Sequence, residues 1–242
     1  MTPPYFYTDL VQHITPVHCQ EAIEFGENPD KHLVLPTGFK ILRDYCPPSS
    51  QEKIDLRKKL NLPLNKIILL SVAAIDKHHK RIDYLIREVH NFANKNIFLM
   101  VLGHQYPESK EIIKLGYQLF GEDNFMSKQL LHSEIGDYYQ TADLFILTSL
   151  KEAFGRVYVE AMSYGLPCFS HDYEVSRYVL GNHGYFGDFR KEGGLSNLLL
   201  NNLSASLNDG KSLERIHSVY DRFSWDVLYP EYIKLFNHFL NE

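Results

Sequence analysis

The chain has 242 residues, of which 44% are hydrophobic, so it can form one large or two small domains with a substantial core. Its formal net charge is -5 and no basic tract stands out, which argues against nucleic acid as the main partner. The three cysteines are far apart and no segment reaches the roughly 20 apolar residues of a membrane span, so we expect reduced thiols in a cytoplasmic protein.

The first 38 residues contain two short predicted strands, at 14–17 and 33–35, separated by a helical segment at 20–26. The turn residues Pro36-Thr37-Gly38 end the second strand. Pro47-Pro48-Ser49-Ser50 then marks a linker, which spans 39–64 and holds a short charged helix at 51–60.

From residue 66 onward, predicted strands alternate with predicted helices, which is typical of a doubly wound parallel sheet with a Rossmann-like α/β fold. The strands are expected at 67–73, 97–102, 124–126, 144–147, 167–170 and 184–187. The helices are expected at 81–93, 109–120, 133–141, 157–164, 174–180, 192–207 and 212–223. We therefore predict one domain over 65–223, followed by a separate amphipathic helix in 224–242.

The most informative stretch is 148–167. A buried strand turns there through Gly155 into an apolar helix, which presents helical N–H groups at the carboxyl edge of the sheet. That geometry suits a phosphate or another anion. Glu152 precedes the turn and Glu160 lies within the helix. Taken singly, Glu152 also fits a solvated loop acid, and Glu160 fits a core glutamate held by a lysine or arginine.

Taken together, these residues resemble the Glu-x7-Glu signature of retaining GT-B glycosyltransferases of family four, from Ala142-Asp143-Leu144 to Cys168. The resemblance implies the C-terminal, nucleotide-sugar-binding half of a GT-B fold. Such an enzyme transfers a sugar from a nucleotide-diphosphate sugar to a sugar or lipid-linked acceptor, with retention at the anomeric carbon. It implies no cofactor and no metal, because helix N–H groups and a lysine neutralise the diphosphate.

The resemblance also implies roles for single residues. Glu152 would accept hydrogen bonds from the donor sugar, and Glu160 from the two ribose hydroxyls, which a carboxylate can receive together. The loop 127–131 would hold the base. The turn residues that would bind the donor are Phe154, Gly155, Arg156 and Val157.

Positive charge gathers in the loop at 76–81, before a predicted helix. Cations are disfavoured at a helix N-terminus unless an anion lies there, so the loop is either a diphosphate clamp or a solvated basic loop. It resembles the family's Gly-Arg-x5-Lys, with Lys80 at the lysine position as a catalytic residue beside Glu152. Ala73 and Ala74 replace the usual Gly and Arg, and Arg81 is the candidate to compensate.

In the family, the acceptor pocket belongs to an N-terminal domain, of which 1–38 would be a remnant. We therefore expect the chain to bind donor but transfer little sugar, and to pair with a separately encoded N-terminal domain or with itself. The apolar residues of 5–17 and of the last helix would need this cover. In the last helix they are Val227, Leu228, Tyr232, Leu235, Phe236 and Phe239.

Two other functions remain open: a non-catalytic nucleotide-sugar-binding module, and a sugar-nucleotide epimerase, which can share the GT-B fold. The location is expected to be cytoplasmic, with a peripheral position at the inner face of a membrane left open.

Overall fold

The computed structural model describes residues 8–240 of the chain. The chain divides into two compact units, one formed by Met1–Arg43 with His217–Glu242 and the other by Asp44–Ile216. Each unit is described by itself.

The larger unit is built on a six-stranded, fully parallel sheet in the order β5-β4-β3-β6-β7-β8. Its strands are β3 (Ile67–Val72), β4 (Ile97–Leu102), β5 (Phe125–Lys128), β6 (Leu144–Leu147), β7 (Cys168–His171) and β8 (Gly184–Gly187). Every residue of β4 and β6 is buried, because helices cover both faces of a parallel sheet. The predicted doubly wound α/β fold is confirmed.

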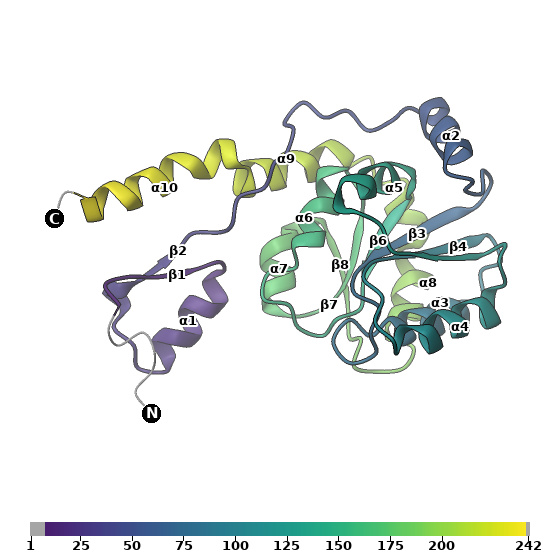
Figure 1. The fold of residues 1–242 in the computed structure, drawn as a ribbon, viewed down its shortest axis with the longest axis horizontal. Coiled ribbons are helices and arrows are strands. Elements are labelled where there is room, and N and C mark those ends of the chain that lie inside the picture. Colours follow the sequence, from purple (N-terminus) through teal and green to yellow (C-terminus); the bar gives the residue numbers. More distant parts are fainter. Residues whose placement is uncertain (1–7, 241–242) are drawn as a thin grey trace. The chain divides into compact units, whose positions relative to one another are not determined.

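Two layers of helices enclose this sheet (Figure 1). The helices of the unit are α3 (Ile82–Asn91), α4 (Ser109–Phe120), α5 (Ile135–Thr141), α6 (Arg156–Ser163), α7 (Glu174–Leu180) and α8 (Gly194–Leu207). From β3 the crossovers run through α3 and α4 toward β5, whereas from β6 they run through α6 and α7 toward β8. Right-handed crossovers in opposite directions put these helix pairs on opposite faces, and α8 returns to pack against α3. The crossovers proceed outward in opposite directions from β3 and from β6, so the point between these two strands is the topological switch point of the sheet.

A further helix, α2 (Ser50–Lys59), is tied to the amino edge of this sheet. The buried Arg57 donates to the carbonyl of Thr141 from Nε at 3.0 Å and from Nη2 at 2.7 Å. Asp143 accepts from Arg57 Nη2 and from Lys53 Nζ, each at 2.7 Å. These contacts group α2 with the sheet, whereas the sequence analysis placed 51–60 in a linker.

The smaller unit contains the parallel strands β1 (Val11–His13) and β2 (His32–Val34), and the helix α1 (Pro16–Glu24) between them. The strand predicted at 14–17 is wrong. Thr15 instead caps α1 by accepting from the backbone N–H of His18, and Pro16 takes the first helical position, which suits its fixed φ.

The last two helices are α9 (Ser212–Phe223), which spans the boundary between the units, and α10 (Trp225–Leu240) in the smaller unit. Of the apolar residues predicted on α10, Leu228 is buried and Tyr232 donates to the carbonyl of Pro36 at 3.1 Å. Residues 5–7 and the side chain of Phe239 lie outside what the structure describes. No helix within the described residues is long and apolar enough to cross a membrane.

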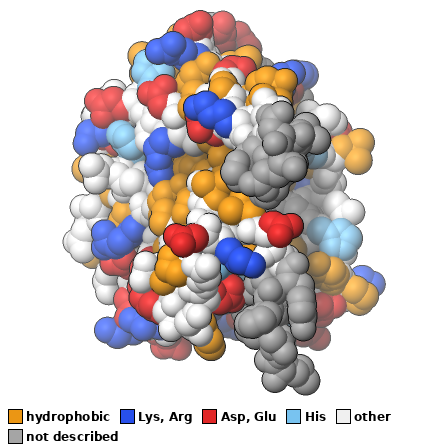
Figure 2. Space-filling view, turned by 90° about the vertical axis from the view of Figure 1, so that its left-hand side faces the viewer, with side chains coloured by type: hydrophobic (Ala, Val, Ile, Leu, Met, Phe, Trp, Pro, Cys, Tyr) orange, Lys and Arg blue, Asp and Glu red, His pale blue; other side chains and the backbone are white. Residues whose placement is uncertain are grey.

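Figure 2 shows hydrophobic side chains among charged ones on one face of the molecule. Several hydrophobic side chains of α10 are exposed. Four exposed residues recur at helical spacing along α10. They are Trp225, Tyr229, Ile233 and Phe236, which we call the α10 stripe.

Candidate functional site

Two loops meet at the carboxyl edge of the sheet, where the strand order switches direction. One follows β3 and carries Lys80, and the other follows β6 and carries Glu152. In doubly wound sheets, this switch point is where ligands bind. Lys80 Nζ lies 2.5 Å from Glu152 Oε1, and the two side chains are 18% and 10% exposed. The structure thus brings the two predicted catalytic residues together in a largely buried ion pair.

Asp76 shapes the first of these loops. Its Oδ1 accepts from the backbone N–H groups of His78, His79 and Lys80, at 2.9, 2.6 and 3.0 Å. Short acidic side chains commonly fold a loop by accepting from the backbone just ahead of them. The turn that presents Lys80 is therefore built by a residue four positions earlier.

Arg81 follows this turn in a left-handed conformation, with φ 54° and ψ 45°, directly before α3. Its Nη1 donates to the carbonyl of Phe189 at 2.6 Å, and its guanidinium carbon lies 4.2 Å from the centre of the Tyr84 ring. The guanidinium is therefore anchored to the segment after β8. Between the two predicted cations, Lys80 is the one that contacts Glu152.

Gly155 makes the second loop possible. It adopts φ 79°, and a Cβ at this position would lie 2.6 Å from Cδ2 of Tyr158. Phe154 is buried beside it, whereas Arg156 and Val157 open α6. Because glycine has no capping side chain, the first turn of the helix presents its N–H dipoles to the carboxyl edge.

Glu160 is the fifth residue of α6, and its Oε2 accepts from the hydroxyl of Tyr139 at 3.1 Å. Tyr139 stacks on Tyr164 with ring centres 5.2 Å apart. Burial and the neighbouring Glu160 carboxylate raise the pKa of Tyr139 well above its ordinary value, so its hydroxyl stays protonated and keeps donating. The partner is thus a tyrosine, where sequence reasoning considered a lysine or arginine.

Two tyrosines lie near the Glu152 carboxylate, the buried Tyr158 and the half-buried Tyr173. The hydroxyl of Tyr158 lies 2.6 Å from Oγ of Ser170. Burial, followed by the charge of Glu152, raises the pKa of Tyr173. Both side chains are uncharged at neutral pH, so the charged neighbour of Glu152 among these residues is Lys80.

Sequence reasoning missed three residues of this site: Asp76, Tyr139 and Thr148. Thr148 directly follows β6 and donates to the carbonyl of Lys80 at 2.8 Å, which joins the two loops. An aspartate at the start of a polar loop often accepts hydrogen bonds from the backbone N–H groups of the next few residues. This turn signal could have indicated Asp76. The other two contact partners 21 and 68 residues away, and no local pattern indicates such contacts.

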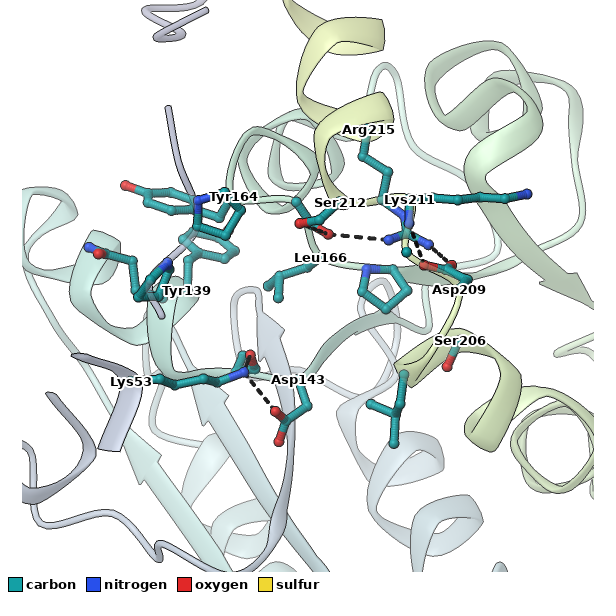
Figure 3. A pocket seen from close by; sticks show the side chains of 18 residues that line it. Lys53, Tyr139, Asp143, Tyr164, Leu166, Ser206, Asp209, Lys211, Ser212 and Arg215 are labelled. Carbon is teal, nitrogen blue, oxygen red and sulfur yellow. Dashed lines mark hydrogen bonds and ion pairs between the residues drawn. The ribbon is translucent and has the colours of Figure 1, made fainter. Parts of the chain in front are cut away.

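A separate cavity of about 220 Å³ lies at the opposite, amino edge of the sheet (Figure 3). It is lined by residues just before β6 and β7, by the connection from α8 to α9, and by the stacked rings of Tyr139 and Tyr164, so its wall includes the tyrosine that contacts Glu160. Its two carboxylates are already paired: Asp143 with Lys53 and Arg57, and Asp209 with Arg215. The pairs of Asp143 fix α2 to the sheet, and the pair of Asp209 fixes α9 to the loop before it, at the edge remote from Lys80 and Glu152. Among the described residues, no group of three or more His, Cys, Asp or Glu side chains is arranged to hold a metal.

Comparison with protein families identifies a match over residues 52–215, more than half of the chain, to the family described as Glycosyl transferases group 1. Among curated proteins, alpha-monoglucosyldiacylglycerol synthase of Streptococcus pneumoniae is 23% identical over 190 residues, which cover 77% of this chain and 43% of that protein. Mannosylfructose-phosphate synthase of Agrobacterium fabrum is 28% identical over 202 residues, which cover 78% and 44%. The chain thus spans less than half the length of these relatives.

Solved structures share the fold. Sucrose-phosphate synthase from Thermosynechococcus elongatus superposes with a TM-score of 0.79 at 21% identity, covering 97% of this chain and 59% of that one. The Anabaena protein Alr3699/HepE in complex with UDP and glucose gives a TM-score of 0.77 at 18% identity, covering 95% and 63%. At these identities the likeness establishes the architecture.

Proposed function

Because the chain belongs to the glycosyl transferases group 1 family, we propose that it is the donor-binding half of a GT-B glycosyltransferase. It binds a nucleotide-diphosphate sugar at the carboxyl edge and supplies it for transfer to an acceptor. The observation that carries the proposal is the ion pair of Lys80 and Glu152 at the switch point between β3 and β6.

Donor binding exchanges this ion pair for two contacts with the ligand. The diphosphate takes the Lys80 ammonium, since charge-assisted hydrogen bonds to phosphate are strong. Glu152 then accepts from the hydroxyls of the transferred sugar. The N–H groups of the first turn of α6, which follows Phe154 and Gly155, support the phosphates, and Glu160 accepts from the ribose. Arg81 contributes by holding the Lys80 loop through Phe189.

Transfer proceeds with retention at the anomeric carbon. The bond from that carbon to the diphosphate oxygen breaks, and the acceptor oxygen bonds on the same face. The proton of the acceptor hydroxyl passes to the leaving diphosphate. This route is supported by the Glu-x7-Glu resemblance, in which both glutamates are assigned to binding and not to a two-carboxylate mechanism. It needs no metal, because Lys80 and the helix N–H groups offset the developing charge.

Uridine-diphosphate sugars are the first donors to test, because the Alr3699/HepE structures contain UDP or UDP-glucose. The acceptor is a sugar or a lipid-linked molecule, and the protein works in the cytoplasm or at the inner face of a membrane. Of the curated relatives, two are named as synthases of a glucosyldiacylglycerol.

The acceptor site is completed by an N-terminal domain or by a second copy of the chain. The α10 stripe supports the same idea, because an exposed row of large apolar side chains is typical of an interaction surface.

A non-catalytic nucleotide-sugar-binding module is the second candidate, and Ala74 favours it, because a methyl group cannot replace the usual arginine charge. Calorimetry with UDP, GDP and ADP, in buffer containing a metal chelator, tests donor binding. Donor turnover in the presence of candidate acceptors then separates the enzyme from the module. If none of the three nucleotides binds, both candidates fail.

A further inference from the structure

We propose that Thr148 is a positioning residue that holds Lys80 in place for the diphosphate, an inference that rests on the proposed function. Thr148 is fully buried. Its hydroxyl lies 2.8 Å from the carbonyl oxygen of Lys80 and 3.2 Å from that of Arg81. The Thr148 hydroxyl, in the loop after β6, thus forms hydrogen bonds to the backbone of the loop after β3.

The backbone at Arg81, directly after Lys80, has a conformation that needs a stabilising contact. Arg81 adopts the left-handed region, which residues with a Cβ other than Asn and Asp rarely occupy. A strained conformation persists only where its surroundings hold it. Here the Thr148 hydroxyl holds the two carbonyls, and the bond from Arg81 Nη1 to Phe189 holds the side chain.

Lys80 is therefore held at both ends by one loop. Its carbonyl accepts from Thr148, and its ammonium contacts Glu152, only four residues further along. These two contacts differ in what a donor does to them. A bound donor replaces the ion pair, because it offers the diphosphate to Lys80 and hydroxyls to Glu152. The hydrogen bond from the Thr148 hydroxyl engages only the backbone carbonyl of Lys80, so it persists and keeps the lysine over the site in both states, which lowers the ordering cost of binding.

Two substitutions separate the hydroxyl from the shape of the side chain. Thr148→Val keeps the shape and removes the donor, whereas Thr148→Ser keeps the donor and removes a methyl group. We expect Thr148→Val to weaken UDP binding about 10-fold, the effect of one buried hydrogen bond, and Thr148→Ser to stay within about 2-fold of wild type. If Thr148→Val does not fold by circular dichroism, Thr148→Ala replaces it.

If Thr148 had a purely structural role, Thr148→Val would weaken UDP binding equally in wild-type protein and in Lys80→Ala. The decisive measurement therefore combines Thr148→Val with Lys80→Ala. A residue that acts through Lys80 has little further effect once Lys80 is gone. We expect Thr148→Val to change UDP affinity less than about 2-fold in the Lys80→Ala protein. An equal loss in both backgrounds, or equal affinities of the Val and Ser variants, would overturn the proposal.

Amide hydrogen exchange of residues 78–82, measured without nucleotide, decides the matter independently of the function. We expect faster exchange in Thr148→Val than in Thr148→Ser or wild type. Unchanged exchange would refute the positioning role even if UDP binds. If wild-type protein binds no nucleotide, the proposed function fails, and the exchange result still shows whether Thr148 orders the Lys80 loop.

Discussion

The ammonium of Lys80 and the carboxylate of Glu152 lie 2.5 Å apart although 72 residues separate them in the chain. Neither charge is well solvated, because the side chains are 18% and 10% exposed. Each charge is the other's partner, and under the proposed function a donor replaces this contact with a diphosphate for Lys80 and sugar hydroxyls for Glu152. The predictions below start from this geometry.

Lys80→Ala should weaken UDP binding by roughly 1.5–3 kcal/mol, the range for hydrogen bonds to a charged group. Lys77→Ala is the matched control, since Lys77 lies in the same loop but is exposed. Calorimetry of both variants checks the prediction. Equal affinities for the two variants would remove Lys80 from the diphosphate site.

Glu160→Gln should weaken binding of UDP more than that of 2′-deoxy-UDP, because the deoxyribose offers one hydroxyl fewer to the carboxylate. Tyr139→Phe serves as a control, because it removes the hydrogen bond to Glu160 but keeps the carboxylate. The measurement is the ratio of the two dissociation constants in each protein. A ratio that does not change in Glu160→Gln would speak against a ribose contact.

Gly155→Ala should destabilise the larger unit more than Gly210→Ala. Both glycines have positive φ, 79° and 66°, so both alanines carry strain of roughly 1–2 kcal/mol. Only at 155 does the new Cβ meet a neighbour within 4 Å, the ring of Tyr158, which adds roughly 1–3 kcal/mol for overpacking. Urea unfolding of the two variants measures the difference, and equal midpoints would contradict it.

The smaller unit should lose stability in mild acid through His13. Nε2 of His13 lies 2.7 Å from Nδ1 of His32, whose Nε2 lies 3.2 Å from Glu27. Burial, then the charges of His32 and His18, lower the pKa of His13, which Glu27 only partly opposes. A histidine with a lowered pKa binds protons better when unfolded, so its contribution is present above about pH 6.5 and is lost as pH falls below it.

The corresponding test compares wild type with His13→Gln by denaturant unfolding at pH 7.5 and 5.5. We expect the free energy of unfolding to fall more between these pH values in the wild type. A parallel dependence in both proteins would show that His13 does not carry the effect.

The α10 stripe should make the isolated chain associate, either with itself or with an N-terminal domain supplied in trans. Replacing Tyr229 and Phe236, which are 60% and 58% exposed, by glutamate should shift light scattering toward the monomer. Leu200→Glu on α8 is the control, since Leu200 is 70% exposed and lies outside the stripe. A monomeric wild type that transfers sugar at ordinary rates would refute the need for a partner.

The elements that could be read from the sequence are those with an unambiguous apolar run between turn residues. Strand β4 and helix α4 have the predicted bounds, because Gly103 and Gly121 end them. The strand expected at 14–17 failed, because apolar residues there outweighed the capping signal of Thr15 before Pro16.

The candidate site divides along similar lines. Lys80, Gly155 and the two glutamates belong to local motifs, so they could be predicted together with their expected roles. The contacts of Thr148 and Tyr139 arise only when strands distant in sequence become neighbours. The anchoring of Arg81 on Phe189 is of the same kind, since 108 residues separate the two. Sequence pattern thus indicates which groups carry chemistry, whereas topology determines which groups hold them.

Asp143 fixes where the α/β unit can be cut. Its Oδ2 accepts from the backbone of Ile68 at 2.7 Å in addition to its bonds to Lys53 and Arg57, so one carboxylate fastens β3, β6 and α2. A shortened chain that starts at 65 would leave this carboxylate partly buried without either cation, which is costly. A chain that starts at 44 keeps the contacts of Asp143 with Lys53 and Arg57. We expect this form of the unit to be the one that folds when it is expressed alone.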